Sequence, residues 1–208
     1  MSGEDGGGSG GPPRGRRASF AERKERRAAV DDPAVVLEAA ARFLAPRARS
    51  VTEVRRRLAG AGYQSALVEG AITRMLELGM LDDEAFARAW VESRDRARPR
   101  GERAIRQELG LKGVDRPTID LVLGERREAA AGMPSEDGEM AITPDQAAAE
   151  RLLARNARSL ARVADPRQRR QRAYALLARN GFDPEVCRTV AVLVDTEAID
   201  GALLEGDD

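Results

Sequence analysis

Residues 79–113 read GMLDDEAFARAWVESRDRARPRGERAIRQELGLKG, and the rest of the chain can be interpreted from this stretch. Asp82 is a good helix N-cap, because its side-chain oxygen can accept a hydrogen bond from the free amides of a first helical turn. Phe86 and Trp90 lie four residues apart and therefore share one face of that helix. We expect three alanines beside them: Ala85, Ala89 and Ala97. Pro99 ends the helix, so the segment predicts an amphipathic helix of about four turns.

A second helix is predicted from about Gly101, with Ile105 and Leu109 as its apolar stripe. The two helices and the turn between them carry a dense group of cations: Arg94, Arg96, Arg98, Arg100, Arg103, Arg106 and Lys112. The acids of the same span are fewer: Asp95, Glu102 and Glu108. We predict that these cations bind phosphate or the acidic side chains of a partner, and the alternative is a solvated helical face.

A helix that closes on glycine occurs three times along the chain. The pattern is Leu-x-x-x-Gly followed by an apolar residue, and its glycines are Gly62, Gly113 and Gly181. Each glycine suits the left-handed C-cap position, and the apolar residue after it can pack back on the helix. One helix precedes each pattern and another follows it, with apolar residues at the helical period. The sequence therefore predicts three tandem three-helix units.

The predicted fold class is all-α, with three tandem three-helix repeats in an elongated, solenoid-like arrangement behind a disordered N-terminal tail. A unit of about 50 residues buries too little surface to be stable alone, so neighbouring units should stack. We expect these segments along the chain: a disordered Gly/Arg-rich tail (1–31), repeat 1 (32–80), repeat 2 (81–130), an acidic linker (131–143), repeat 3 (144–195) and an acidic tail (196–208). The N-terminal tail is expected to be a solubilising segment or a tether for nucleic acid.

Composition supports this fold and excludes several kinds of site. Apolar residues make up 42% of the chain but aromatic residues only 3%, which favours helices packed through Ala, Leu and Val over sheets. Cations and acids balance at 35 each, and all cations but Lys24 and Lys112 are arginine. The absence of histidine excludes catalysis and metal binding that depend on it. The single cysteine, Cys187, lies in an apolar stretch and is expected to be a buried hydrophobe.

No apolar run of the sequence approaches the ~18 residues of a membrane span, and the N-terminus lacks the apolar core of a signal peptide. We therefore expect a soluble, cytoplasmic protein. The acid pair Asp82-Asp83 is explained by helix capping, so no catalytic site is predicted. The chain also lacks the glycine-rich loop with Lys and Ser or Thr that cradles nucleotide phosphates.

The stretch 79–113 also resembles the signature of the RecX family, whose members are bacterial modulators of the RecA recombinase. The resemblance is carried first by Gly79-Met80-Leu81-Asp82-Asp83, Phe86-Ala87 and Arg94. It is carried next by Gly101, Ile105-Arg106-Gln107-Glu108-Leu109 and Lys112-Gly113, and it extends more weakly from Ala34 to Val194. One departure is that Glu102 follows Gly101 and Ala104 precedes Ile105, where the family commonly has Gly-Pro and a further basic residue.

This resemblance implies a non-enzymatic regulator without a cofactor. Its partners would be RecA and the RecA nucleoprotein filament, whose ATPase, strand exchange and SOS coprotease activity it would modulate during DNA recombination and repair, with inhibition favoured over stimulation. We expect an extended monomer with weak, sequence-independent DNA contact and no membrane association.

Two other functions are compatible with the helical pattern. The first is a helix-turn-helix-like transcriptional regulator, which needs exposed Arg, Asn or Gln at the start of a recognition helix. The third helices begin inconsistently, at Gln64-Ser65, Arg116-Pro117 and Asp183-Pro184. The second is an all-helical adaptor whose charges form solvated faces. For Phe86 and Trp90 we expect core packing, and the alternative is an interface anchor.

Overall fold

The computed structural model describes residues 19–131 and 142–204, and within these ranges it contains helices and turns but no strand. The helices are α1 (Phe20–Ala28), α2 (Pro33–Leu44), α3 (Val51–Ala61), α4 (Ser65–Glu77), α5 (Asp83–Ala97), α6 (Glu102–Lys112), α7 (Arg116–Ala131), α8 (Pro144–Ala161), α9 (Pro166–Arg179) and α10 (Pro184–Leu204). The all-α prediction is confirmed.

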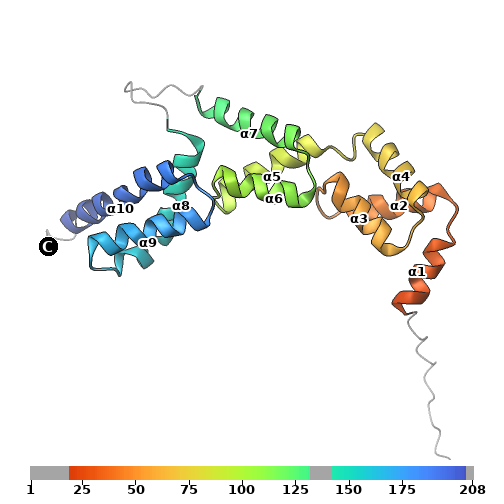
Figure 1. Ribbon diagram of the computed structural model, residues 1–208, viewed down its shortest axis with the longest axis horizontal. Coiled ribbons are helices and arrows are strands. Elements are labelled where there is room, and N and C mark those ends of the chain that lie inside the picture. Colours follow the sequence, from red (N-terminus) through yellow and green to blue (C-terminus); the bar gives the residue numbers. More distant parts are fainter. Residues whose placement is uncertain (1–18, 132–141, 205–208) are drawn as a thin grey trace, which may run out of the picture.

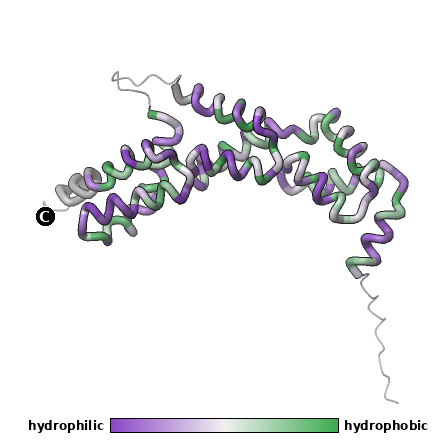
Figure 2. Tube along the Cα trace, viewed as in Figure 1, coloured by the Kyte–Doolittle hydropathy of each residue, from purple (hydrophilic) through white to green (hydrophobic). Residues whose placement is uncertain are grey.

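Successive groups of three helices form three units, each with its own core. Unit 1 comprises α2 to α4 and buries Met75, unit 2 comprises α5 to α7 and buries Ile105 and Leu109, and unit 3 comprises α8 to α10 and buries Phe182. Cys187 is fully buried in unit 3, as predicted. Figure 1 shows the three units in an elongated row, and Figure 2 shows apolar residues alternating with polar ones along each helix.

The predicted helix ends are confirmed. The Asp82 side chain accepts a hydrogen bond from the amide of Ala85 at 2.9 Å, which caps α5. At the other ends, Gly62, Gly113 and Gly181 adopt left-handed backbone with φ of 104°, 81° and 81°. These local signals explain why the helices begin and end where they do.

Two of these glycines also permit adjacent units to approach closely. A Cβ at Gly113 would lie 2.4 Å from the Thr52 side chain, and a Cβ at Gly181 would lie 2.4 Å from the Ala104 side chain. Gly101 is equally crowded, since its Cβ would lie 2.3 Å from the carbonyl oxygen of Gly181. The end of the second helix in one unit therefore abuts the start of the second helix in the preceding unit.

Residues 20–28 correct one expectation, because they form α1 although the segment 1–31 was expected to be disordered. A capping box between Ser19 and Glu22 satisfies the first amides of the helix. The expectation for residues 1–18 lies outside the described residues.

Docking on unit 1 is the second reason that α1 forms. A Cβ at Gly62 would lie 2.5 Å from the Lys24 side chain, so α1 contacts the end of α3 as closely as the units contact one another. The Gln64 side-chain amide donates hydrogen bonds to the carbonyl oxygens of Ala28 and Val30 at 3.0 and 3.1 Å. Helix α1 therefore contacts the end of α3 at the first end of the row (Figure 1).

Three further expectations can be compared with the structure. The buried stripe of α5 consists of Phe86, Ala87 and Val91, whereas Ala85, Ala89 and Ala97 are exposed. The expected stripe was wrong on that side because α5 packs against both α6 and α7. Helix α10 continues to Leu204, past the expected end of repeat 3. Most of the expected linker, residues 132–141, lies outside the described residues.

Candidate partner-binding surface at the α5–α6 turn

The carboxylate of Glu108, on α6, holds two of the predicted binding cations within unit 2. It accepts hydrogen bonds from Nε1 of Trp90 at 2.8 Å and from Nε of Arg94 at 2.6 Å. Nε of Arg100 lies 3.7 Å from its other oxygen. The guanidinium of Arg94 also stacks 4.3 Å from the centroid of Trp90, a cation–π contact. Because the side chains of Arg94 and Glu108 are only 19% and 23% exposed, Arg94 stabilises the fold and is not free for a partner.

Lys112, the last residue of α6, joins unit 2 to unit 1. Its Nζ lies 2.8 Å from Oε1 of Glu53, on α3, and 5.1 Å from the centroid of Trp90. Its backbone oxygen accepts a hydrogen bond from Oγ of Ser50 at 2.6 Å. Burial alone would raise the pKa of Glu53, but hydrogen bonds from Lys112 and Arg47 outweigh burial and hold that pKa below its usual value. Glu53 is therefore ionised when it pairs with Lys112.

Two more of the predicted cations pair on the surface. Arg106 bonds to Glu102 at 3.1 Å and also pairs with Asp120, on α7. Arg96 pairs with Glu92 one turn earlier on α5. Ion pairs at a solvated surface contribute little to stability, so a partner could displace them at small cost.

Arg100 lies at the contact between units 2 and 3. Its Nη1 donates to Oδ1 of Asn180 at 2.7 Å, and the adjacent amide of Gly101 donates to the backbone oxygen of Asn180 at 3.0 Å. From α8, Nη2 of Arg155 donates to the carbonyl oxygen of Arg96 at 2.9 Å. The Arg-rich turn is therefore docked on unit 3.

Arg98 and Arg103 differ from the other five predicted cations. Arg98 is the C-cap of α5, Arg103 is the second residue of α6, and both side chains are exposed. Neither side chain has a hydrogen bond or ion pair with any residue that the structure describes. These two arginines are the cations of the cluster that can meet a partner without breaking an existing contact.

A buried ion cluster at the same joint carried no signal in the sequence. Arg126, on α7, has a side chain only 7% exposed and donates to Asp95 at 2.8 and 3.0 Å and to Asp145 at 2.7 Å. Burial alone would lower the pKa of Arg126, but hydrogen bonds to the two carboxylates outweigh burial and raise it. The three residues come from α7, α5 and α8, so only the folded arrangement reveals their contact.

Within residues 19–131 and 142–204, no group of three or more metal-ligating side chains is placed to hold an ion. No helix in the same ranges has both the length and the apolar character needed to cross a bilayer. The feature that distinguishes this surface is therefore its pattern of paired and unpaired arginines.

Three family models match the chain in the order of its units. They describe the first three-helix domain of RecX over residues 37–75, the second over residues 82–123 and the third over residues 144–190. The chain belongs to the RecX family. The resemblance seen in the sequence is confirmed, and the RecX family is one of non-enzymatic regulatory proteins.

Curated relatives of this RecX-family chain are named regulatory protein RecX. The protein from Mycobacterium avium is 31% identical over 150 residues, which cover 72% of this chain and 79% of that protein. The protein from Chlorobium phaeobacteroides is 28% identical over 157 residues, covering 76% and 91% of the two chains. The stretch matched to Mycobacterium sp. (strain JLS) is 38% identical over 94 residues and spans about half of that relative's length, 51%.

Solved structures of RecX proteins share the fold. The crystal structure of RecX from Lactobacillus salivarius superposes with a TM-score of 0.64 at 17% identity, covering 80% of this chain and 98% of that one. A second crystal structure of regulatory protein RecX gives a TM-score of 0.60 at 19% identity, covering 82% and 72%. The prediction of tandem three-helix repeats is confirmed.

Proposed function

We propose that this protein binds the RecA recombinase and the RecA nucleoprotein filament in the cytoplasm. There it inhibits ATP hydrolysis, strand exchange and the SOS coprotease activity of RecA. It acts as a monomer and without a cofactor. Membership of the RecX family supports this function, together with the extended shape and the two unpaired arginines of the α5–α6 turn.

The elongated row of units is the observation that carries the proposal (Figure 1). Hydrogen bonds connect units 1 and 2 at Ser50 and Lys112, and units 2 and 3 at Gly101 and Asn180. A body held at both joints can lie along a filament and touch several protomers, whereas one compact unit would touch a single protomer. Bridged protomers cannot change their relative positions, and a bound copy at a filament end blocks further growth.

Arg98 and Arg103 place two unpaired charges at the middle of this row. Guanidinium groups form paired hydrogen bonds with carboxylates and phosphates, so both acidic side chains of RecA and the phosphates of bound DNA are suitable contacts. Such contacts weaken as salt rises. Any contact with DNA through these two arginines is weak and independent of sequence.

The alternative of a helix-turn-helix transcriptional regulator has less support from the geometry. Gln64 would have to read bases at the start of α4, but its side-chain amide already donates to two carbonyl oxygens of the α1–α2 connection. Asp183, at the start of α10, is an acid that caps its own helix by accepting from the Glu185 amide at 2.9 Å. A common recognition helix would need similar donors in each unit.

Single-stranded-DNA-dependent ATP hydrolysis by RecA from the same host, titrated with this protein, tests the proposal. The expected result is loss of hydrolysis well below one protein per RecA protomer, since blocked growth needs few copies. A parallel assay on DNA alone should show weak binding that salt abolishes. Unchanged hydrolysis at equimolar protein, with a salt-resistant and sequence-specific footprint on DNA, would instead favour the transcriptional regulator.

A further inference from the structure

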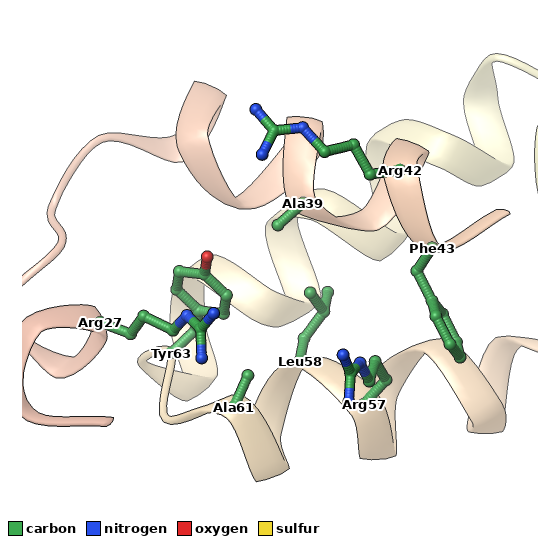
Figure 3. A pocket seen from close by; sticks show the side chains of 8 residues that line it. All are labelled: Arg27, Ala39, Arg42, Phe43, Arg57, Leu58, Ala61 and Tyr63. Carbon is green, nitrogen blue, oxygen red and sulfur yellow. The ribbon is translucent and has the colours of Figure 1, made fainter. Parts of the chain in front are cut away.

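A cavity of about 280 Å³ opens at the first end of the row, between α1, α2 and α3 (Figure 3). Its apolar lining comes from small and aliphatic side chains: Ala39, Leu58 and Ala61. Two of the chain's few aromatic rings border it: Phe43 and Tyr63. Three arginines also line the cavity, each from a different helix: Arg27, Arg42 and Arg57. In Figure 3 the guanidinium of Arg42 points away from the two aromatic rings. The cavity is therefore apolar inside and basic at its edge.

The cations of this cavity are almost unpaired. Arg27 and Arg57 have no ion pair with any described residue, and their guanidinium groups lie 5.8 and 5.6 Å from the centroids of Tyr63 and Phe43. Arg42 pairs with Glu38 one turn earlier, but the two side chains are 73% and 62% exposed, so this bond is weak. The cavity therefore has unused capacity to bind an anion.

The position in unit 2 that corresponds to Arg57 carries the opposite charge. Arg57 lies five residues before the left-handed Gly62, and Glu108 lies five residues before the left-handed Gly113. In unit 2 the carboxylate of Glu108 binds Trp90 and neighbouring arginines, so the aromatic ring and the charges satisfy one another. In unit 1 the charge at that position is reversed. The guanidinium of Arg57 borders the cavity and lies 5.6 Å from the centroid of Phe43, whose ring also has the guanidinium of Arg49 at 4.3 Å (Figure 3).

These features suit a flat ring that carries a negative charge. A nucleic-acid base stacks on aromatic rings and guanidinium planes, and its phosphate accepts the paired hydrogen bonds of arginine. We propose that the cavity lined by Phe43, Tyr63, Arg27 and Arg57 binds a nucleotide, with the base in the apolar interior and the phosphate at the arginines. The side chains of Asp and Glu have no ring for the interior, and a duplex offers no unstacked base. The source is therefore an unpaired strand or a free nucleotide.

Helix α1 completes this nucleotide site, because it supplies Arg27. The hydrogen bonds of Gln64 to Ala28 and Val30 hold the end of α1 beside Tyr63. The site thus depends on the segment that the composition alone predicts to be disordered. The proposal is independent of the RecA-binding function, since nothing in it requires RecA.

Fluorescence anisotropy with the full chain and labelled oligonucleotides, without RecA, tests the site. The probes are an oligothymidylate of about 12 nucleotides, an abasic strand of equal length and the matching duplex. Wild-type protein should bind the oligothymidylate more tightly than the other two. Tyr63→Leu should weaken binding of the oligothymidylate about tenfold, the effect of losing one stacked base, and leave binding of the abasic strand unchanged.

A double variant distinguishes binding at the cavity from non-specific electrostatic attraction to the protein. Arg27→Ala with Arg57→Ala should weaken binding of both single-stranded probes, because it removes the phosphate contacts. The matched control is Arg158→Ala, on α8, with Arg162→Ala, at the C-cap of α8. Both residues are exposed, and this variant should bind like the wild type. The double variants replace surface charges, so they remain informative if Tyr63→Leu lowers the melting temperature.

Competition identifies the source of the nucleotide. Displacement of the oligothymidylate by thymidine monophosphate indicates that the ligand is a free nucleotide. If the oligothymidylate binds and thymidine monophosphate does not displace it, the ligand is an unpaired strand. Both results support the site. The proposal fails if wild-type protein binds the abasic strand as tightly as the oligothymidylate. It also fails if the α8 control loses as much affinity as the Arg27 and Arg57 double variant.

Discussion

Asp145, in the first turn of α8, accepts a hydrogen bond at 3.0 Å from the backbone amide of Glu102, the first residue of α6. Asp83, the first residue of α5, makes the same contact at 2.9 Å with the amide of Val51, the first residue of α3. In each case the first helix of one unit caps the second helix of the preceding unit. A carboxylate at a helix N-terminus also interacts favourably with the helix dipole. The contact between units 2 and 3 therefore repeats the contact between units 1 and 2, both in its shape and in its capping carboxylate.

The first prediction concerns the joint between units 1 and 2. Asp83→Ala removes the acceptor for the Val51 amide and should lower the free energy of unfolding by about 1 kcal/mol. Asp83→Asn keeps an oxygen acceptor and should be no less stable than the wild type at neutral pH. Thermal unfolding of the three proteins measures this, and equal losses in both variants would contradict the cap.

The pH dependence of the same pair follows from the pKa of Asp83. Burial raises this pKa above its usual value, and the hydrogen bond from Val51 only partly opposes it. The carboxyl group of Asp83 therefore binds a proton more tightly in the folded state than in the unfolded state. Its ionised form lowers the stability of the protein at neutral pH, and this loss disappears as pH falls through the raised pKa. The melting temperature of Asp83→Asn minus that of the wild type should therefore shrink as pH falls toward about 4. A difference that widens on acidification would show that the pKa is not raised.

The contact between units 2 and 3 can be tested with glycine variants. Gly181 has φ of 81°, and a Cβ on it would lie 2.4 Å from the Ala104 side chain. Gly181→Ala should therefore cost about 1–3 kcal/mol and loosen unit 3, which faster limited proteolysis within unit 3 would detect. The control is Gly110→Ala, inside α6, where nothing lies within 4 Å and a gain of about 0.5–1 kcal/mol is expected. Similar behaviour of the two variants would mean that the close approach at Gly181 is unimportant.

The buried ion cluster should be the most costly joint to break. Arg126→Met leaves Asp95 and Asp145 without their shared cation, and a loss of about 3–5 kcal/mol is expected in urea unfolding. Arg127→Met is the matched control, because Arg127 is 58% exposed and its pair with Glu102 should contribute less than about 1 kcal/mol. If both variants unfold at the same urea concentration, the cluster does not hold the units together.

Local signals explain which features were predictable from the sequence. Caps such as Asp82 and left-handed glycines such as Gly113 depend on a few adjacent residues, so the helices and their threefold grouping could be predicted. Which cations are paired and which are free could not be predicted, because their partners lie far along the chain. Lys112 is 59 residues from Glu53, and Arg100 is 80 residues from Asn180. The formation of α1 likewise depends on docking at Gly62, which its Gly- and Arg-rich surroundings do not indicate.

Substitutions of Trp90 test whether this residue stabilises the fold or anchors an interface. Its ring packs on Phe86 with centroids 5.9 Å apart, and its Nε1 donates to Glu108. Trp90→Ala should therefore destabilise the protein by about 3–5 kcal/mol, measured by urea unfolding. Trp90→Phe keeps the ring and should lose less, with the Glu108 carboxylate short of one donor. A Trp90→Ala variant that keeps its melting temperature but no longer binds RecA would make Trp90 an interface anchor.

The last prediction tests the surface proposed to contact RecA. Arg98→Glu combined with Arg103→Glu should weaken binding to the RecA filament by roughly tenfold or more at low salt, because two unpaired charges are reversed. The melting temperature should not change, since neither side chain has a polar partner among the described residues. Arg158→Glu with Arg162→Glu makes an equal change of charge at the C-terminal end of α8 and should bind filaments almost normally. Equal loss in both double variants would indicate a general charge effect. Unchanged affinity in the Arg98 and Arg103 variant would place the RecA contact elsewhere on the row of units.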